Sequence, residues 1–124
     1  LPKRIARGEK HIVDAIIYLM SAIAVSDHSL KREEIEELNE IGREYGVGET
    51  YIKEVLSKMI KLRKAGENDK LIAVTKESVD MLKGAPQMTI SFVIDKAKRV
   101  MEADGVISKS EEQIYAYMIQ QLAK

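Results

Sequence analysis

A short pattern that occurs twice constrains the fold more than any other feature of this sequence. In both copies a dense apolar run leads into Asp-x-x-(Leu or Ile)-x-x-x-Glu, first from Asp27 to Glu34 and again from Asp104 to Glu111. An apolar helix, a tight polar turn and a second helix account for each copy, because turn and capping residues separate two segments of helical periodicity. The sequence therefore predicts two helix–turn–helix units of similar design.

The rest of the chain also has helical periodicity, and no segment alternates polar and apolar residues as a strand does. Helices are expected over residues 10–26, 31–45, 49–64, 87–103 and 109–122, with a further one that Asn68 or Asp69 caps and residues 84–86 break. The first and fifth of the six in chain order are apolar on most sides, which is typical of helices at the centre of a bundle. We predict a single all-α domain over residues 1–124, a compact bundle of about five to seven helices with an internal pseudo-twofold repeat.

The same patterns predict where individual side chains lie. The helix that follows Asn68 should turn toward the core Leu71, Ile72, Thr75, Val79 and Leu82. Ile107 should pack the second turn against the core. His28 occupies the place of Gly105 in the first copy and is expected to be a turn residue.

Composition excludes several classes of function. Lys and Arg together number 20, as do Asp and Glu, so the formal net charge is zero. A nucleic-acid binder with a broad basic face is therefore not expected, because such proteins gain affinity by neutralising phosphates. The absence of cysteine excludes disulfides and thiolate chemistry and favours a reducing, cytoplasmic location. No apolar run approaches the ~18 residues of a membrane span.

The residues of the second turn have a purely structural interpretation. Gly105 suits a position with positive φ, and Asp104 can hydrogen-bond to nearby backbone. Ser108 and Glu111 form Ser-x-x-Glu, the capping box in which each side chain accepts a hydrogen bond from backbone at the other end. Helix capping alone explains these residues.

The first copy suggests an additional role for the acids. Lys31 stands where the capping serine would be, so no box is expected there, yet Asp27 and Glu34 are retained. Hard divalent cations prefer oxygen ligands, and Asp27, Glu34, Asp104 and Glu111 would supply carboxylates. We therefore expect these four residues to be the metal ligands of a divalent cation such as calcium, magnesium or zinc, in a site that is either weak or built from carboxylates of both turns.

An EF-hand-like interpretation is the alternative. Residues 104–111 match the second half of an EF-hand loop, Asp-Gly-x-Ile-x-x-x-Glu. The first half fails, because the opening ligand position falls on Val100, and on Ile23 in the other copy. Calcium needs about six to eight oxygen ligands. Neither copy is a standard EF-hand, which leaves a degenerate, calcium-responsive regulatory protein as the alternative function.

No catalytic motif is present. His11 and His28 are too few for a zinc site without cysteines. The serines lie in no Gly-x-Ser-x-Gly elbow, and no glycine-rich phosphate loop occurs. The sequence therefore predicts a protein that is not an enzyme and has no organic cofactor.

With both turns considered together, the chain resembles the TerB-like (tellurite-resistance) superfamily, which includes a domain of DjlA-type co-chaperones. Residues 20–27, 30–34 and 103–111 carry the resemblance, because two apolar helices end there in turns of the Ala-x-Asp-Gly-x-Ile type. The first turn departs from the family pattern at Ser26, His28 and Lys31. The resemblance implies a helical bundle with pseudo-twofold halves, a role in stress or toxic-oxyanion resistance, and metal ligation by acids at the turns. It also implies larger assemblies near the membrane.

These observations lead to one functional expectation. The chain is expected to be a non-enzymatic, protein-interaction module that binds a partner protein, with weak metal binding at the acidic turns. A homodimer is compatible with the sequence, whereas nucleic acid is not expected as a partner.

Overall fold

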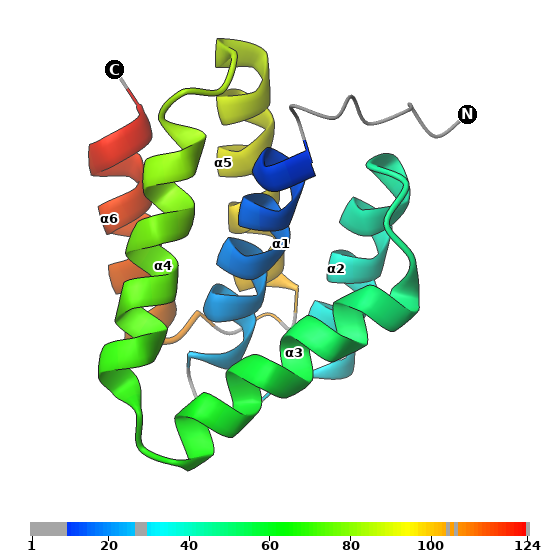
Figure 1. Ribbon diagram of the computed structural model, residues 1–124, viewed down its shortest axis with the longest axis vertical. Coiled ribbons are helices and arrows are strands. Elements are labelled where there is room, and N and C mark those ends of the chain that lie inside the picture. Colours follow the sequence, from blue (N-terminus) through cyan, green and yellow to red (C-terminus); the bar gives the residue numbers. More distant parts are fainter. Residues whose placement is uncertain (1–9, 27–29, 104, 106, 124) are drawn as a thin grey trace.

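The computed structural model describes residues 10–26, 30–103, 105 and 107–123. Over these residues it is helical without any strand, which confirms the predicted all-α class. The helices are α1 (Lys10–Val25), α2 (Arg32–Glu44), α3 (Glu49–Lys64), α4 (Asn68–Leu82), α5 (Gln87–Glu102) and α6 (Lys109–Leu122). Figure 1 shows them arranged as a bundle with α1 in its middle. No helix end differs from its predicted position by more than two residues.

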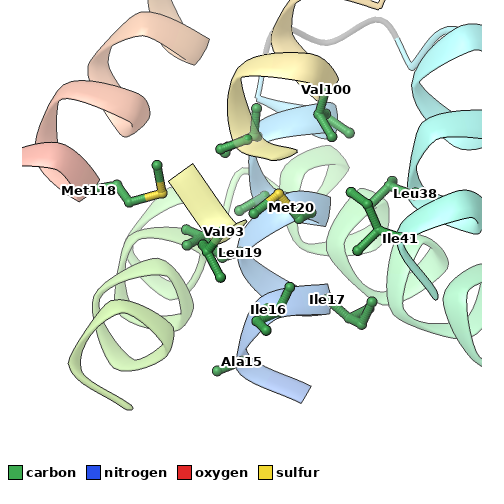
Figure 2. Packing of buried hydrophobic residues seen from close by; sticks show 14 of the residues in the cluster. Ala15, Ile16, Ile17, Leu19, Met20, Leu38, Ile41, Val93, Val100 and Met118 are labelled. Atoms are coloured by element: carbon green, nitrogen blue, oxygen red, sulfur yellow. The ribbon is translucent and has the colours of Figure 1, made fainter. Parts of the chain in front are cut away.

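The central helix is α1, which contacts each of the other helices. It can do so because its apolar residues lie on nearly every side, and most of them are buried. Figure 2 shows buried side chains of α2, α5 and α6 around it. The buried apolar residues of α1 are Val13, Ala15, Ile16, Ile17, Leu19, Met20, Ala22, Ile23, Ala24 and Val25.

The prediction of a second central helix is wrong for α5. This helix packs on α1, α2 and α6 through one face, which includes Val93, Ala97 and Val100. Its opposite face is exposed, and Met88 near its N-terminus is 86% exposed. The difference arises because charged residues interrupt the apolar pattern in α5, whereas α1 has few of them.

The predicted repeat is present in the helix lengths. Helices α1 and α2 have 16 and 13 residues, and α5 and α6 have 16 and 14. Segments of equal length, residues 26–31 and 103–108, connect the two pairs. Helices α3 and α4 lie between the pairs in the chain and both contact α1. The duplicated sequence pattern thus corresponds to a duplicated helical hairpin.

Two apolar residues are more exposed than the periodicity predicts. Ile72 of α4 is 52% exposed and Ile107 in the second turn is 42% exposed, so the prediction that both pack into the core is wrong. The prediction is confirmed for three other residues of α4, since Thr75, Val79 and Leu82 are buried. Ile72 lies beside the groove described below.

A buried lysine joins α5 to α2. Lys96 is 7% exposed, and its Nζ lies 3.3 Å from Glu44 Oε1 and 5.2 Å from the centre of the Phe92 ring. The Phe92 ring also meets Tyr45 edge-on, with centroids 5.3 Å apart. A buried ammonium needs such partners, because an unpaired charge away from water is costly. These contacts fix the α2–α5 interface.

Two polar contacts join α1 to α3. The Tyr51 hydroxyl donates a hydrogen bond of 2.7 Å to Asp14 Oδ1, and the Lys58 ammonium lies 3.3 Å from the Tyr18 hydroxyl. Desolvation by burial, followed by the hydrogen bond to Asp14, raises the pKa of Tyr51 above its usual value of 10.0. The neutral phenol is therefore the form that the fold stabilises.

We expect Tyr51→Phe to lower the free energy of unfolding by about 1 kcal/mol near neutral pH, the usual net value of one hydrogen bond. The deficit should shrink as the pH rises above 10.0, the usual pKa of the phenol. There the unfolded chain loses the Tyr51 proton while the folded chain keeps it, so the wild-type fold loses stability that the variant never had. Urea unfolding of both proteins from neutral to alkaline pH measures this. A deficit that is constant with pH would contradict it.

Candidate functional site

The two glutamates of the repeated pattern occupy the same position in their helices. Glu34 and Glu111 are each the third residue of their helix, and both side chains are 0% exposed. Glu34 Oε1 accepts the Lys31 N–H at 2.9 Å, and Glu111 Oε1 accepts the Ser108 N–H at 2.9 Å. Each glutamate thus satisfies a backbone donor at the start of its helix.

The prediction that Lys31 prevents a capping box is right for only half of the box. The ammonium of Lys31 has no lone pair with which to accept a backbone hydrogen bond. The Ser108 hydroxyl, in contrast, accepts the Glu111 N–H at 3.1 Å, so the second copy has both halves. In the first copy Glu34 still performs its half. Its retention therefore has a structural reason, and the loss of the serine no longer implies a second role.

Only two of the four predicted metal ligands, Glu34 and Glu111, belong to the residues that the structure describes. Asp27 and Asp104 lie outside the described residues. Within those residues, no group of three or more Asp, Glu or His side chains is placed to hold a metal ion. Glu34 and Glu111 each use one carboxylate oxygen to accept a backbone N–H. These two side chains alone therefore provide too few oxygen ligands for calcium. The four-carboxylate site stays a prediction that depends on Asp27 and Asp104.

One buried carboxylate oxygen is nevertheless available as a ligand for a cation. Glu111 Oε2 is buried and has no hydrogen-bond partner among the described residues. A buried oxygen without a donor costs free energy, and a bound cation is one way to offset that cost. Glu111 is therefore the residue on which the cation hypothesis can be tested most directly.

The structure supports the reasoning against a standard EF-hand. Val100 and Ile23 occupy the positions at which an EF-hand loop would begin, and both side chains are fully buried in the core. They are held inside helices α5 and α1 rather than in a loop. The sequence match to an EF-hand is thus confined to the turn and the helix start.

A groove lies along α4 and α6. It is open to solvent and has a volume of about 490 Å³, within the range typical of ligand sites. Figure 1 shows α4 and α6 beside each other with both N-terminal ends at the lower side of the molecule, and the two helices are in contact. The residues along the groove are Ala22, Val25, Ser26, Arg63, Asn68, Leu71, Ile72, Thr75, Lys76, Ser110, Gln113, Ile114 and Tyr117.

Helical spacing explains why these residues share the groove. On both helices they recur at intervals of three and four, from Asn68 to Lys76 on α4 and from Ser110 to Tyr117 on α6. Such intervals place side chains on one face of a helix. The end of α1 contributes Ala22 and Val25 to the same groove. The groove is thus bordered by two N-terminal helix halves and by the end of α1.

Three polar side chains of the groove donate hydrogen bonds to backbone carbonyl oxygens. Arg63, at the end of α3, donates a hydrogen bond from Nη1 to the Val25 carbonyl oxygen. The hydroxyls of Ser26 and Thr75 donate to the carbonyl oxygens of Ile23 and Leu71, both at 2.9 Å. These two hydroxyls are therefore committed to backbone, whereas Arg63 retains further N–H donors, since a guanidinium has five.

Sequence reasoning did not find this groove. Ile72 was expected in the core, and the lining comes from helices that are far apart in the sequence. One signal was available, because Leu71 and Ile72 are adjacent and a helix with a narrow core face cannot bury both fully. That signal indicates an exposed apolar residue, but it does not indicate what lies beside it.

No family model, curated protein or solved structure matches the chain. Over the described residues, no helix has both the length and the apolarity to cross a membrane.

Proposed function

We propose that this chain is a non-enzymatic protein-interaction domain that holds a segment of a partner protein in the groove between α4 and α6. The exposed Ile72 beside this open groove is the observation that carries the proposal. Ile72 lines this groove together with Leu71 and Ile114, and burial of such a contiguous apolar lining against a partner would remove it from water. Grooves between helices commonly accept amphipathic segments.

The resemblance to TerB-like proteins belongs to this proposal. It implies a helical module that works within larger assemblies, which suits a binding role. A cytoplasmic location and association with stress resistance are part of the same proposal. A homodimer is the alternative assembly, and it would be detected as concentration-dependent mass in solution.

A second candidate is a cation-dependent role for the acidic turns, which includes the degenerate EF-hand alternative. The buried Glu111 Oε2, which has no hydrogen-bond partner among the described residues, favours it. This candidate does not compete with the groove, because Glu111 is not one of the residues that line it. Its test is given in the Discussion.

Peptides selected from a random library against the whole chain test the groove. We expect Ile72→Glu to weaken the binding of selected peptides by about tenfold or more, since a charge replaces an apolar contact. Met81→Glu is the matched control, because Met81 is an exposed apolar residue of the same helix that does not line the groove. Fluorescence anisotropy with labelled peptides gives the dissociation constants.

Peptides that bind both variants equally well, or a library that yields no binder, would contradict the proposed function. Circular dichroism of the two variants checks that both remain folded. Amide chemical shifts supply a second readout. The selected peptides should shift amides along α4 and α6 more than those of α2.

A further inference from the structure

The charged side chains that line the groove are both cations. Arg63 and Lys76 line it, and none of the described residues that line it is Asp or Glu. The hydrogen bond from Arg63 to the Val25 carbonyl oxygen holds the guanidinium in place. A fixed guanidinium loses little conformational freedom when it binds a carboxylate through its other N–H groups. Lys76 is exposed, so it can move to meet a ligand.

Two helix N-termini also border the groove. Asn68 is the first residue of α4 and Ser110 is the second residue of α6, and both line the groove. The first turn of a helix carries the positive end of the helix dipole, although in α6 Ser108 and Glu111 already cap this turn. Glu67, the residue before α4, is paired with Lys70 at 2.8 Å. Asp69 and Glu112 are exposed and do not line the groove.

The groove also has apolar walls. Ile72 of α4 and Ile114 of α6 lie along it, with Ala22 and Val25 of α1. A ligand that matches both kinds of lining has apolar side chains on one face and carboxylates beside them that can reach Arg63 or Lys76. A basic or a wholly polar segment would leave either the charges or the apolar walls without a partner.

We infer that the partner segment is an acidic amphipathic peptide, whose carboxylates meet Arg63 and Lys76 while its apolar residues pack on Ile72 and Ile114. This inference rests on the proposed function and specifies the chemistry of the partner. It combines the helix-in-groove mode with recognition of acidic groups by cations.

The chain itself does not supply a suitable segment among its described residues. Its most acidic helix, α2, exposes Glu33 and Glu40, but the apolar residues of α2, Leu38 and Ile41, are fully buried in its own core. A second copy of α2 would therefore offer charge without an apolar face. The partner is accordingly expected to be a different protein.

The test uses synthetic peptides in matched forms. One form is a helix-forming peptide with leucines at intervals of three and four and glutamates between them; the other replaces each glutamate by glutamine. We expect the acidic form to bind the wild-type chain, and Lys76→Glu to weaken this binding by about fivefold or more, as loss and reversal of one partly exposed ion pair would. Lys53→Glu is the control, since Lys53 is exposed on α3 and does not line the groove.

The outcomes separate this inference from the proposed function. Weaker binding to Lys76→Glu but not to Lys53→Glu, and binding that falls with added salt, would support the inference. If the glutamine form binds as tightly and Ile72→Glu weakens it, the groove is a peptide site but the inference of an acidic partner is wrong. If neither peptide, nor any library peptide, binds in a way that depends on Ile72, the inference and the proposed function both fail.

Discussion

Leu19→Ala is expected to lower the free energy of unfolding by about 3 kcal/mol, the usual cost of truncating a buried leucine. Leu19 is 0% exposed on α1, and α1 contacts every other helix. The lost methyl groups therefore leave a cavity that no single helix can close by moving. Domains of this size have a total stability of about 5–15 kcal/mol, so the loss is a large fraction.

Urea unfolding followed by circular dichroism measures this effect. Ile72→Ala is the control, because Ile72 is 52% exposed and its truncation should cost less than about 1 kcal/mol. The two substitutions remove similar numbers of carbon atoms, so the difference between their losses of unfolding free energy reflects the different burial of the two side chains. Equal losses in both variants would contradict the central position of α1.

The second large effect is expected at Glu111. Glu111→Ala should cost about 2–3 kcal/mol, because it removes a fully buried side chain and the acceptor for the Ser108 N–H. Glu111→Gln should cost less than about 1 kcal/mol if capping is the only role, since glutamine can serve in a capping box. Thermal unfolding of both variants, with Glu34→Gln beside them, provides the comparison.

The same variants test the cation hypothesis. A cation that binds only the folded chain raises its melting temperature in proportion to the logarithm of its concentration. If calcium, magnesium or zinc at millimolar concentration stabilises the wild-type chain, Glu111→Gln should reduce that gain, because an amide is a weaker ligand than a carboxylate. A melting temperature that none of the three ions changes would remove the cation hypothesis and leave capping as the role of both glutamates.

The helices could be predicted because their signals are local. Periodic apolar residues, the Ser108 cap and the glycine of the second turn each act over a few residues, and Gly105 has the positive φ expected of it, 80°. The duplicated hairpin followed from the same signals. Burial was harder to predict, as Lys96 and Ile72 show, because both depend on which helix lies opposite.

The candidate site could be predicted only in part. The sequence identified Glu34 and Glu111 as a pair in equivalent positions, and the structure places both at the third residue of a helix. It did not indicate that Glu34 would keep half of a capping box beside Lys31, because that hydrogen bond uses backbone rather than the missing hydroxyl. The groove was missed because its walls come together only through the packing of α4 and α6 on α1.

The burial of α1 on all sides has a consequence for any shorter form of this protein. A fragment that contained only the first hairpin, α1 and α2, would leave most of the surface of α1 in water, since α3, α4, α5 and α6 all cover part of it. Such a fragment could reach a stable state only by associating with further polypeptide, for example the missing C-terminal piece added in trans. Reassembly from two separately expressed pieces is therefore a property that this architecture makes measurable.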